Sequence, residues 1–428
     1  RTRSENFMSY DIASIWAATA RKRPSFPSLD TSVKTDVAII GAGFTGLSAA
    51  LHLAEAGTDV TVLDSRDPGF GASGRNGGQV IPGIKYDPDE IDRVYGEDTT
   101  EFAGRTAEFT FDLIRRLAID CNAQRNGWIQ ASVKSAHLEK LESRARQWEK
   151  RGAPTEVLST DQVQVLTGSD AFKGGWLDSR AGPLHPLNYV TGLALAAQAK
   201  GAAIHADTKA IRLEKLSSGW RIHTKSGASI TAAHVVVATN GYSGEFLPKL
   251  RATVIPANSF QVATQPLSPD QLSRILPRQT PVSDSRRLAN YFRIGPEGRL
   301  MFGGRGNFRD DPAADDYRKI IAGLHWIYPE LAEAQIAFRW TGRVAMTYDH
   351  LPHLHQPFDD LTIALGYNGR GLALASALGA AIGRHIADRS QPLPFEFSKI
   401  NPLPLHRLHP YYATMAIWYY RLRDMLES

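Results

Sequence analysis

Three separated apolar runs organise the chain, and the first of them opens a complete strand–helix–strand pattern. Val37–Ile40 is an uninterrupted apolar run with β-branched residues, which is typical of a parallel strand buried on both faces. Apolar residues then recur at helical spacing over Leu47–Ala54, and Gly57 stands where a helix C-cap belongs. A second apolar strand follows at Val60–Leu63, so the pattern predicts a parallel β–α–β unit.

The other two apolar runs also end in glycine turns. One run lies in the segment His234–Ser243, and the other opens Thr362–Arg384, where it leads into GYNGRG and a helix rich in small residues from Leu372. Between them, Ala252–Phe308 alternates apolar and polar positions around a turn at 295–298, which predicts an antiparallel sheet.

These patterns predict an α/β fold with α+β insertions. A discontinuous Rossmann-type dinucleotide-binding domain is expected to be interleaved with an antiparallel-sheet substrate domain. The expected boundaries are 1–90, 155–245 and 335–390 for the first domain and 91–154 and 246–334 for the second. The remaining residues, 391–428, are expected to form a C-terminal segment that packs on the body. Near the other end of the chain, residues 9–27 are expected to pack across the dinucleotide-binding domain as an irregular, aromatic arm.

The turn between the first strand and its helix carries the chemistry of a dinucleotide site. It reads GAGFTG: Gly41 permits the sharp bend, Gly43 lets a pyrophosphate approach the backbone, and Gly46 lets the helix pack closely on the sheet. Asp64 ends the second strand about 20 residues later, where a carboxylate can accept hydrogen bonds from a ribose. The whole unit in register favours nucleotide binding over a plain glycine-rich turn.

A second glycine-rich stretch, GFGASGRNGGQ at 69–79, interleaves glycines with polar side chains. So many glycines indicate a backbone wrapped closely against a flat, polar ligand.

Composition excludes several classes of function. The 428 residues are 43% hydrophobic and 22% charged, with a net charge of +5 and a sequence pI near 9.1. Lys and Arg are scattered among acids, which argues against a nucleic-acid groove.

The single cysteine, Cys121, allows no internal disulfide or CxxC pair, and a packed thiol is expected. No secretion signal or transmembrane stretch is recognisable, so a cytoplasmic enzyme is the default expectation. His350, His353 and His355 lack metal-site spacing, so no metal is expected.

The two glycine-rich stretches together resemble those of the FAD-dependent amine and amino-acid oxidoreductases that include D-amino-acid oxidase, sarcosine oxidase and glycine oxidase. The likeness is strongest to the bacterial gamma-glutamylputrescine oxidases. It rests on DVAIIGAGFTGLSAALHLAEAG (36–57) and GFGASGRNGGQ (69–79), and further on WTG at 340–342 with Asp349 and Pro352. The resemblance implies FAD, bound without a covalent link, and a small-molecule amine as substrate, with O2 or another electron acceptor. Oligomers are compatible with it.

The resemblance also implies which residues contact FAD. The expected set combines both glycine-rich stretches, the strand-end acid and the ends of the later strands: Gly41, Gly43, Phe44, Thr45, Gly46, Asp64, Ser65, Arg66, Ala72, Ser73, Arg75, Asn76, Gly77, Gly78, Gln79, Ala210, Ala238, Thr239, Gly241, Gly366, Tyr367, Gly369, Arg370, Gly371 and Leu372. Many relatives have histidine where Arg370 stands. A helix N-terminus or a cation there would stabilise the anionic reduced flavin.

No catalytic side chain is identifiable from the sequence, and the substrate-pocket candidates are Tyr242, Tyr291, Arg293 and Trp340. Amino-acid-oxidising relatives often carry an arginine where this chain has Val344, which favours an amine, perhaps a gamma-glutamylated or other N-substituted one, over an α-amino acid. Arg293 was the remaining candidate for a carboxylate clamp. An amino-acid oxidase or dehydrogenase, an NAD-dependent dehydrogenase and a non-catalytic FAD-binding module stay open as alternatives.

Overall fold

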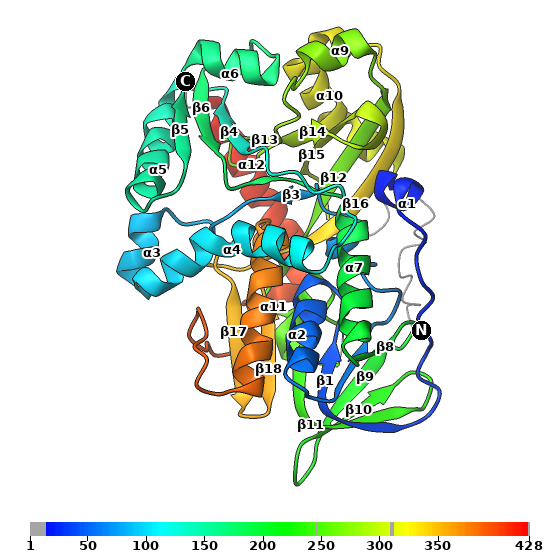
Figure 1. Cartoon of the computed structure of the whole chain (residues 1–428). Coiled ribbons are helices and arrows are strands. Elements are labelled where there is room, and N and C mark those ends of the chain that lie inside the picture. Colours follow the sequence, from blue (N-terminus) through cyan, green and yellow to red (C-terminus); the bar gives the residue numbers. More distant parts are fainter. Residues whose placement is uncertain (1–13, 245, 309–311, 427–428) are drawn as a thin grey trace.

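The computed structural model describes residues 14–244, 246–308 and 312–426. Two sheets, each with its own helices, form the two bodies seen in the lower and upper halves of Figure 1. Both sheets have eight strands.

The first sheet has the strand order β17-β18-β11-β1-β2-β8, with β10 and β9 added beside β11. The pairs that join β18, β11, β1, β2 and β8 are parallel, whereas β17, β10 and β9 are antiparallel to their neighbours. In the order given, the strands span His353–Phe358, Leu361–Leu365, Ser229–Val237, Val33–Ile40, Val60–Leu63, Ala203–His205, Trp220–Thr224 and Ala210–Lys215.

Three helices cover one face of this sheet: α2 (Phe44–Glu55), α7 (Pro186–Ala199) and α11 (Gly371–Ala387) (Figure 1). Val37 and Ile39 of β1 join the apolar cluster under these helices, while Ala38 and Ile40 join a cluster on the opposite face. The expected burial of β1 on both faces is therefore confirmed, and so is the Rossmann-type β1–α2–β2 unit.

The second sheet has the order β16-β12-β15-β14-β13-β4-β6-β5. It is antiparallel except where β13 lies parallel to β4. In the order given, its strands span Ile336–Met346, Ile255–Pro266, Arg299–Arg305, Tyr291–Ile294, Val282–Asp284, Trp128–Ser132, Gly174–Asp178 and Thr155–Leu158. The expected antiparallel sheet is present, but it recruits strands from a longer stretch of the chain than 246–334.

The remaining elements connect and cover these sheets. Among the described residues β3 pairs with β7 alone, and α4 crosses the middle of the molecule in Figure 1. Their bounds are Gln79–Val80 (β3), Gly182–Pro183 (β7), Ile15–Thr19 (α1), Pro88–Tyr95 (α3), Glu97–Arg116 (α4), Leu138–Lys150 (α5), Thr160–Thr167 (α6), Pro248–Arg251 (α8), Pro269–Arg274 (α9), Arg318–Ile327 (α10) and His409–Leu426 (α12).

The expected domain boundaries need correction at three places. Strand β6 pairs with both β4 and β5, so residues 155–178 belong to the second sheet and not to the first domain. Strand β16 pairs with β12 along most of its length, so 336–346 also belongs to the second sheet. Helix α4 packs on α11, and its apolar face joins the core of the first body. These memberships depend on pairing between distant residues, which local patterns do not encode.

The C-terminal segment contacts the body through its first part. Phe395 is buried against Tyr95 and Phe102, and Ser398 donates its backbone N–H to the carbonyl oxygen of Leu354. Helix α12 follows and leaves several aromatic side chains exposed, including Tyr411 and Trp418. Residues 9–13 of the expected N-terminal arm lie outside the described residues.

Candidate functional site

The turn that follows β1 is shaped by two glycines. Gly41 has a φ of +109°, and a Cβ there would lie 2.8 Å from the carbonyl oxygen of Ala238. A Cβ on Gly46 would lie 1.9 Å from the carbonyl oxygen of Gly41. The bend and the close helix–sheet approach therefore both require glycine, as the sequence predicted.

Gly43 has a different constraint. Its φ of −91° is open to any residue, so its need for glycine is steric and does not come from backbone strain. A Cβ would lie 2.9 Å from the hydroxyl of Ser73, which accepts a hydrogen bond from the backbone N–H of Phe44 at the start of α2. Ser73 therefore joins the 69–79 stretch to the N-terminus of α2, where an anion is favoured.

Asp64 ends β2 beside this turn. One carboxylate oxygen accepts the backbone N–H of Ala42 at 2.8 Å, and the other accepts that of Arg66 at 3.1 Å. Burial raises the pKa of Asp64 to about 6, against the opposing effect of these hydrogen bonds. Asp64 as a whole residue nevertheless keeps some accessible surface.

The 71–79 stretch is held in place by side chains from the second sheet. Gln261 and Trp340 both donate to the carbonyl oxygen of Arg75, at 2.7 and 2.9 Å. Trp16 of α1 donates to the carbonyl oxygen of Asn76 at 2.9 Å. The two bodies thus meet at this stretch, and its backbone is fixed from three separate elements.

Arg293 holds the next residues of the same stretch. Its Nη1 donates to the carbonyl oxygens of Gly78 and Leu184 at 2.7 and 2.8 Å, and its Nε donates to that of Ile294. The side chain is 7% exposed, and burial lowers its pKa to about 9. Because Nη1 and Nε donate to backbone carbonyls, Arg293 supports the loop. Its role as a clamp for a substrate carboxylate stays a prediction.

Trp340 is likewise a supporting residue. It is 1% exposed, its indole N–H is used on Arg75, and its ring contacts that of Trp16 edge to face. Its place as a substrate-pocket candidate therefore does not fit its burial.

The two tyrosine candidates lie against glycines of the same stretch. A Cβ on Gly77 would lie 3.2 Å from the ring of Tyr291, whose hydroxyl is hydrogen-bonded to that of Ser259. A Cβ on Gly71 would lie 3.1 Å from the ring of Tyr242, whose hydroxyl accepts the backbone N–H of Arg343. Tyr291 borders the backbone expected to face the flavin, whereas Tyr242 also ties that stretch to β16.

Two asparagine side chains hold the turn after β18: Asn240 ties it to the end of β11, and Asn368 ties it to Thr347 just after β16. Asn240 accepts the backbone N–H of Gly366 through its side-chain oxygen at 2.9 Å. Asn368, 2% exposed, accepts the backbone N–H of Thr347 and donates to the carbonyl oxygen of Gly366. Gly366 and Gly369 have φ values of +82° and +85°, so the turn before α11 needs glycine at both positions.

Arg370 is the N-cap residue of α11 and is partly accessible. Its guanidinium lies 4.8 Å from the centre of the Trp128 ring, and burial lowers its pKa to about 10. Tyr367 beside it donates to or accepts from the hydroxyl of Thr45 in α2 at 2.6 Å, so the starts of α2 and α11 are joined.

The other expected cofactor residues fall around the same turn ends. Ala238 donates its N–H to the carbonyl oxygen of Ile40, and Thr208, two residues before Ala210, donates its N–H to that of Asp64. The remaining members of the expected set flank these positions: Ser65, Arg66, Ala72, Gln79, Thr239, Gly241, Gly371 and Leu372. The fold therefore brings the expected set to one edge of the first sheet and to the face of the second sheet that meets it.

Sequence reasoning missed several residues that shape this site. Asn240 and Asn368 have φ values of +46° and +52°, and they stand beside glycines in the TNGY and YNGR turns. Asn-Gly pairs signal turns, so this signal was present. Gln261 and the role of Trp16 gave no local signal, because their partners lie far away in the sequence.

The arrangement fits an extended dinucleotide. Gly43 is partly accessible, although its neighbours Ala42 and Phe44 are buried, so the start of α2 presents a bare backbone face. Asp64, the residue expected to bind the ribose, lies beside the turn, and the backbone of Gly77 lies beside Tyr291. A nucleotide site in the first body, faced by a sheet of the second, defines a two-domain dinucleotide-dependent oxidoreductase.

Sequence comparison identifies the family. Residues 36–388 match the FAD dependent oxidoreductase (DAO) family, and the chain belongs to it. FAD is accordingly the cofactor of this enzyme.

Two curated relatives are similar over almost the whole chain. Gamma-glutamylputrescine oxidoreductase of Escherichia coli (strain K12) is 33% identical over 98% of this chain and 100% of its own length. The probable oxidoreductase OrdL of Rhizobium meliloti (strain 1021) is 34% identical over 96% of each chain.

Solved structures support the fold. Glycine oxidase from Geobacillus kaustophilus superposes with a TM-score of 0.73 at 20% identity, covering 87% of this chain and 99% of its own. L-proline dehydrogenase from P. horikoshii gives 0.71 at 20% identity, covering 90% and 99%.

Two further expectations concern metals and membranes. His353 contacts Asp349 and His355 contacts the carbonyl oxygen of Ser398, and no group of three or more metal-ligating side chains occurs among the residues described. Within the same part of the chain, every helix is too short or too polar to cross a bilayer.

Cys121 is buried, and burial raises the pKa of its thiol to about 12, as expected for a packed cysteine.

Proposed function

We propose that this enzyme oxidises a C–N bond of an N-substituted amine of the gamma-glutamylputrescine kind, giving an imine that hydrolyses to a carbonyl product. The observation that carries the proposal is the full-length similarity to gamma-glutamylputrescine oxidoreductase, which covers both bodies and the cofactor stretches alike.

The arrangement around β16 supports an amine over an α-amino acid. Val344 occupies the position where amino-acid-oxidising relatives often carry arginine, and β16 is extended there, so Arg343 faces the other side of the sheet. Nε and Nη1 of Arg293 already donate to backbone carbonyls. These contacts count against its use as a clamp for an α-carboxylate.

FAD, when bound, supplies the two-electron oxidation by accepting a hydride, and O2 or another acceptor later takes up the electrons. The chain's own task is to hold the neutral amine in line and to exclude water. Tyr291 is partly accessible and its ring borders the backbone of Gly77, which is expected to face the flavin, so it is our candidate to flank the substrate. The residues that fix the 71–79 stretch keep that geometry constant.

A second candidate, an amino-acid oxidase or dehydrogenase, is favoured by the fold likeness to glycine oxidase alone. The two functions separate in one experiment. The purified enzyme is mixed anaerobically with putrescine, gamma-glutamylputrescine, sarcosine, glycine or D-alanine, and bleaching of the flavin near 450 nm is followed over about a minute.

We expect gamma-glutamylputrescine to reduce the flavin at least about tenfold faster than any free α-amino acid. Faster reduction by an α-amino acid than by every amine would overturn the proposal. No reduction by any compound, with FAD fully bound, would favour a non-catalytic module.

A further inference from the structure

Arg370, at the start of α11, lays its guanidinium over the ring of Trp128 in β4. The guanidinium carbon lies 4.8 Å from the ring centre, which is within the range of a cation–π interaction. Within the described residues, the side chain of Arg370 forms no hydrogen bond and no ion pair with Asp or Glu. Because an arginine side chain is long and flexible, the ring contact is what gives this charge a fixed position.

The contact joins the two bodies of the protein. Arg370 belongs to α11, which covers the first sheet, whereas Trp128 lies in β4 of the second sheet. Trp128 is 2% exposed, and its ring meets that of Trp176 edge to face, with 5.7 Å between the ring centres. The ring is therefore fixed within the second body, and Arg370 reaches it from the first.

Hydrogen bonds link Trp128 to the glycine-rich stretch 69–79. The indole N–H of Trp128 donates to the hydroxyl of Ser283 at 3.1 Å, and this hydroxyl donates to the side-chain oxygen of Gln79 at 3.2 Å. Gln79 closes the stretch that is expected to contact FAD. A connected series of side chains thus runs from the cofactor stretch to the ring that holds Arg370.

Strand register places these side chains on one face of the second sheet. Ser283 pairs with Gln130 of β4 on one side and with Tyr291 of β14 on the other, so the three side chains leave the same face. Trp128 stands two residues before Gln130 and therefore shares that face. The ring of Tyr291 lies against Gly77, where an added Cβ would be 3.2 Å away. The face that presents the Trp128 ring is therefore the face that meets the cofactor stretch.

The starts of α2 and α11 bring positive charge to the same place. Tyr367, in the turn before α11, is hydrogen-bonded through its hydroxyl to that of Thr45 in α2 at 2.6 Å, so the two helix N-termini lie together. Each N-terminus carries a partial positive charge. Burial lowers the pKa of Arg370 to about 10, so its guanidinium still keeps its proton at neutral pH. Arg370 thus adds a full charge to two partial ones.

An aromatic ring holds this cation without cancelling its charge. Burial lowers the pKa of Arg370, and the negative charges of Asp178 and Asp87 oppose that shift. Both acids already have an ion-pair partner, Arg180 and Arg144 respectively. A carboxylate partner for Arg370 would fix the guanidinium and also neutralise it. The indole ring fixes it and leaves the net charge in place.

We propose that Trp128 is a positioning residue that holds the charge of Arg370 beside bound FAD and so raises the reduction potential of the cofactor. Hydride transfer from the substrate brings two electrons and one proton, so the cofactor gains one negative charge. A cation that is already held in place stabilises that charge, since no reorganisation is needed when it forms. The inference rests on FAD as the cofactor and not on which amine is oxidised.

The test measures the reduction potential of the FAD-loaded protein by equilibration with a redox dye, without any substrate. Trp128→Leu removes the ring, and Arg370→Met removes the charge while keeping a long side chain. Site-specific replacement of Trp128 by tetrafluorotryptophan keeps the shape and the N–H donor but withdraws electron density from the ring face, so it weakens the cation–π contact. Trp176→Leu is the matched control, since Trp176 is also 2% exposed and packs on the Trp128 ring.

We expect Trp128→Leu to lower the potential. The ring only selects among positions of the Arg370 side chain, so its removal cannot cost more than the contact itself, about 5–30-fold in an equilibrium constant. We expect about 3–10-fold, which is a potential about 15–30 mV lower for a two-electron couple. Arg370→Met should lower the potential by about 60 mV, as for loss of a preorganised charge worth about 100-fold. Trp128→Leu should add nothing in the Arg370→Met background, and Trp176→Leu should match the wild type.

The tetrafluorotryptophan protein decides the matter if the cavity left by Trp128→Leu prevents folding or FAD binding. It should show a lower potential than the wild type at unchanged stability in urea unfolding. An unchanged or raised potential in this protein would overturn the inference. An equal fall in Trp176→Leu, or a fall on changing Trp128 that persists in the Arg370→Met background, would overturn it as well.

This measurement is independent of the proposed reaction. If no amine reduces the flavin but the potential falls in the Trp128 variants as described, the positioning role stands and the proposed function fails. If gamma-glutamylputrescine reduces the flavin of every variant while the potential stays constant, the proposed function stands and the positioning role fails.

Discussion

Replacing Arg293 by Met tests whether this buried arginine supports the cofactor loop or reaches the substrate. Met has a similar length and fills the space, but it cannot donate. The substitution leaves the carbonyl oxygens of Gly78 and Leu184 without the donors now at 2.7 and 2.8 Å. The perturbation therefore acts on the backbone at the end of the 71–79 stretch.

The magnitude follows from the acceptor that loses its donor. The carbonyl oxygen of Gly78 keeps the backbone N–H of Leu184 at 2.8 Å, so the carbonyl of Leu184 is the one left without its donor. A buried carbonyl left unpaired costs about 1–3 kcal/mol, and Met also removes the cost of burying a charge, which the lowered pKa of Arg293 reflects. We therefore expect a loss of about 1–2 kcal/mol of unfolding free energy.

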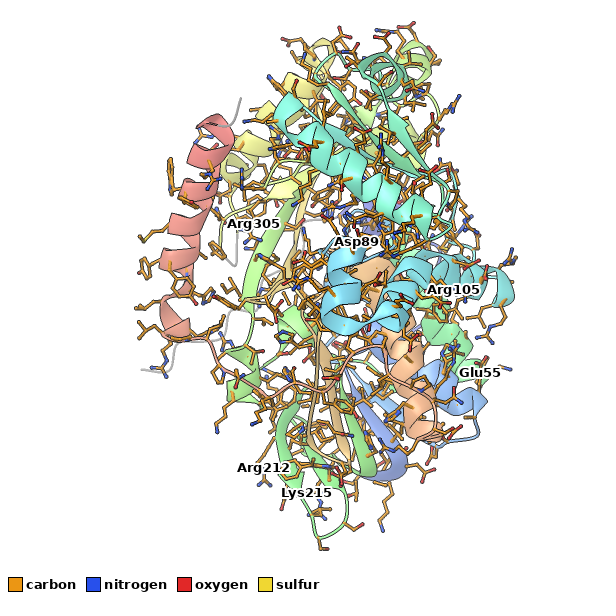
Figure 2. All side chains as sticks on the ribbon, turned by 90° about the vertical axis from the view of Figure 1, so that its left-hand side faces the viewer. Glu55, Asp89, Arg105, Arg212, Lys215 and Arg305 are labelled. Carbon is orange, nitrogen blue, oxygen red and sulfur yellow. The ribbon has the colours of Figure 1, made fainter. Side chains whose placement is uncertain are left out.

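Urea unfolding of the cofactor-free protein measures this loss, and fluorescence titration measures FAD affinity, which should fall because the loop must be ordered before FAD binds. Arg212→Met, in the exposed strand β9 (Figure 2), is the matched control and should change neither quantity by more than about 0.5 kcal/mol. Unchanged stability and FAD affinity, combined with a raised KM for carboxylate-bearing substrates only, would refute the supporting role.

Three other outcomes are expected. Acid precipitation should release all the yellow colour, because the chain's one cysteine is buried and the flavin is held without a covalent bond; colour in the pellet would contradict this. Gly43→Val should abolish FAD retention, since its side chain would meet the Ser73 hydroxyl and fill the phosphate approach, whereas Ser73→Ala removes only a capping bond worth about 1 kcal/mol and should still bind FAD. Because folding raises the pKa of Asp64 from 3.8 to about 6, the folded state binds the proton more tightly. The free energy of unfolding of the cofactor-free protein should therefore fall as the pH rises from 4 to 6, and Asp64→Asn should flatten that slope in urea unfolding.

The local sequence determined the nucleotide-binding half of this protein. The β1–α2–β2 unit, its glycines, Asp64 and the small-residue helix α11 all follow from periodicity and turn chemistry within a few dozen residues. Gly41 and Gly46 have the roles that their positions predicted, because a sharp turn leaves no room for a Cβ whatever surrounds it. At Gly43, which was expected to let a pyrophosphate approach the backbone, the structure adds a second constraint, since a Cβ there would meet the hydroxyl of Ser73.

The tertiary structure decided which side chains face the substrate. Arg293 and Trp340 looked like pocket residues, since each stands on an alternating strand, but strand register places their donors on backbone carbonyls of the 71–79 stretch. Register likewise sets Arg305 opposite Ser259 and beside Tyr291. Pairing between strands far apart in the chain leaves no mark on local periodicity. The chain's own pattern therefore predicted a dinucleotide site, whereas the contacts of Arg293 and Trp340 with the 71–79 stretch form only after the two sheets have come together.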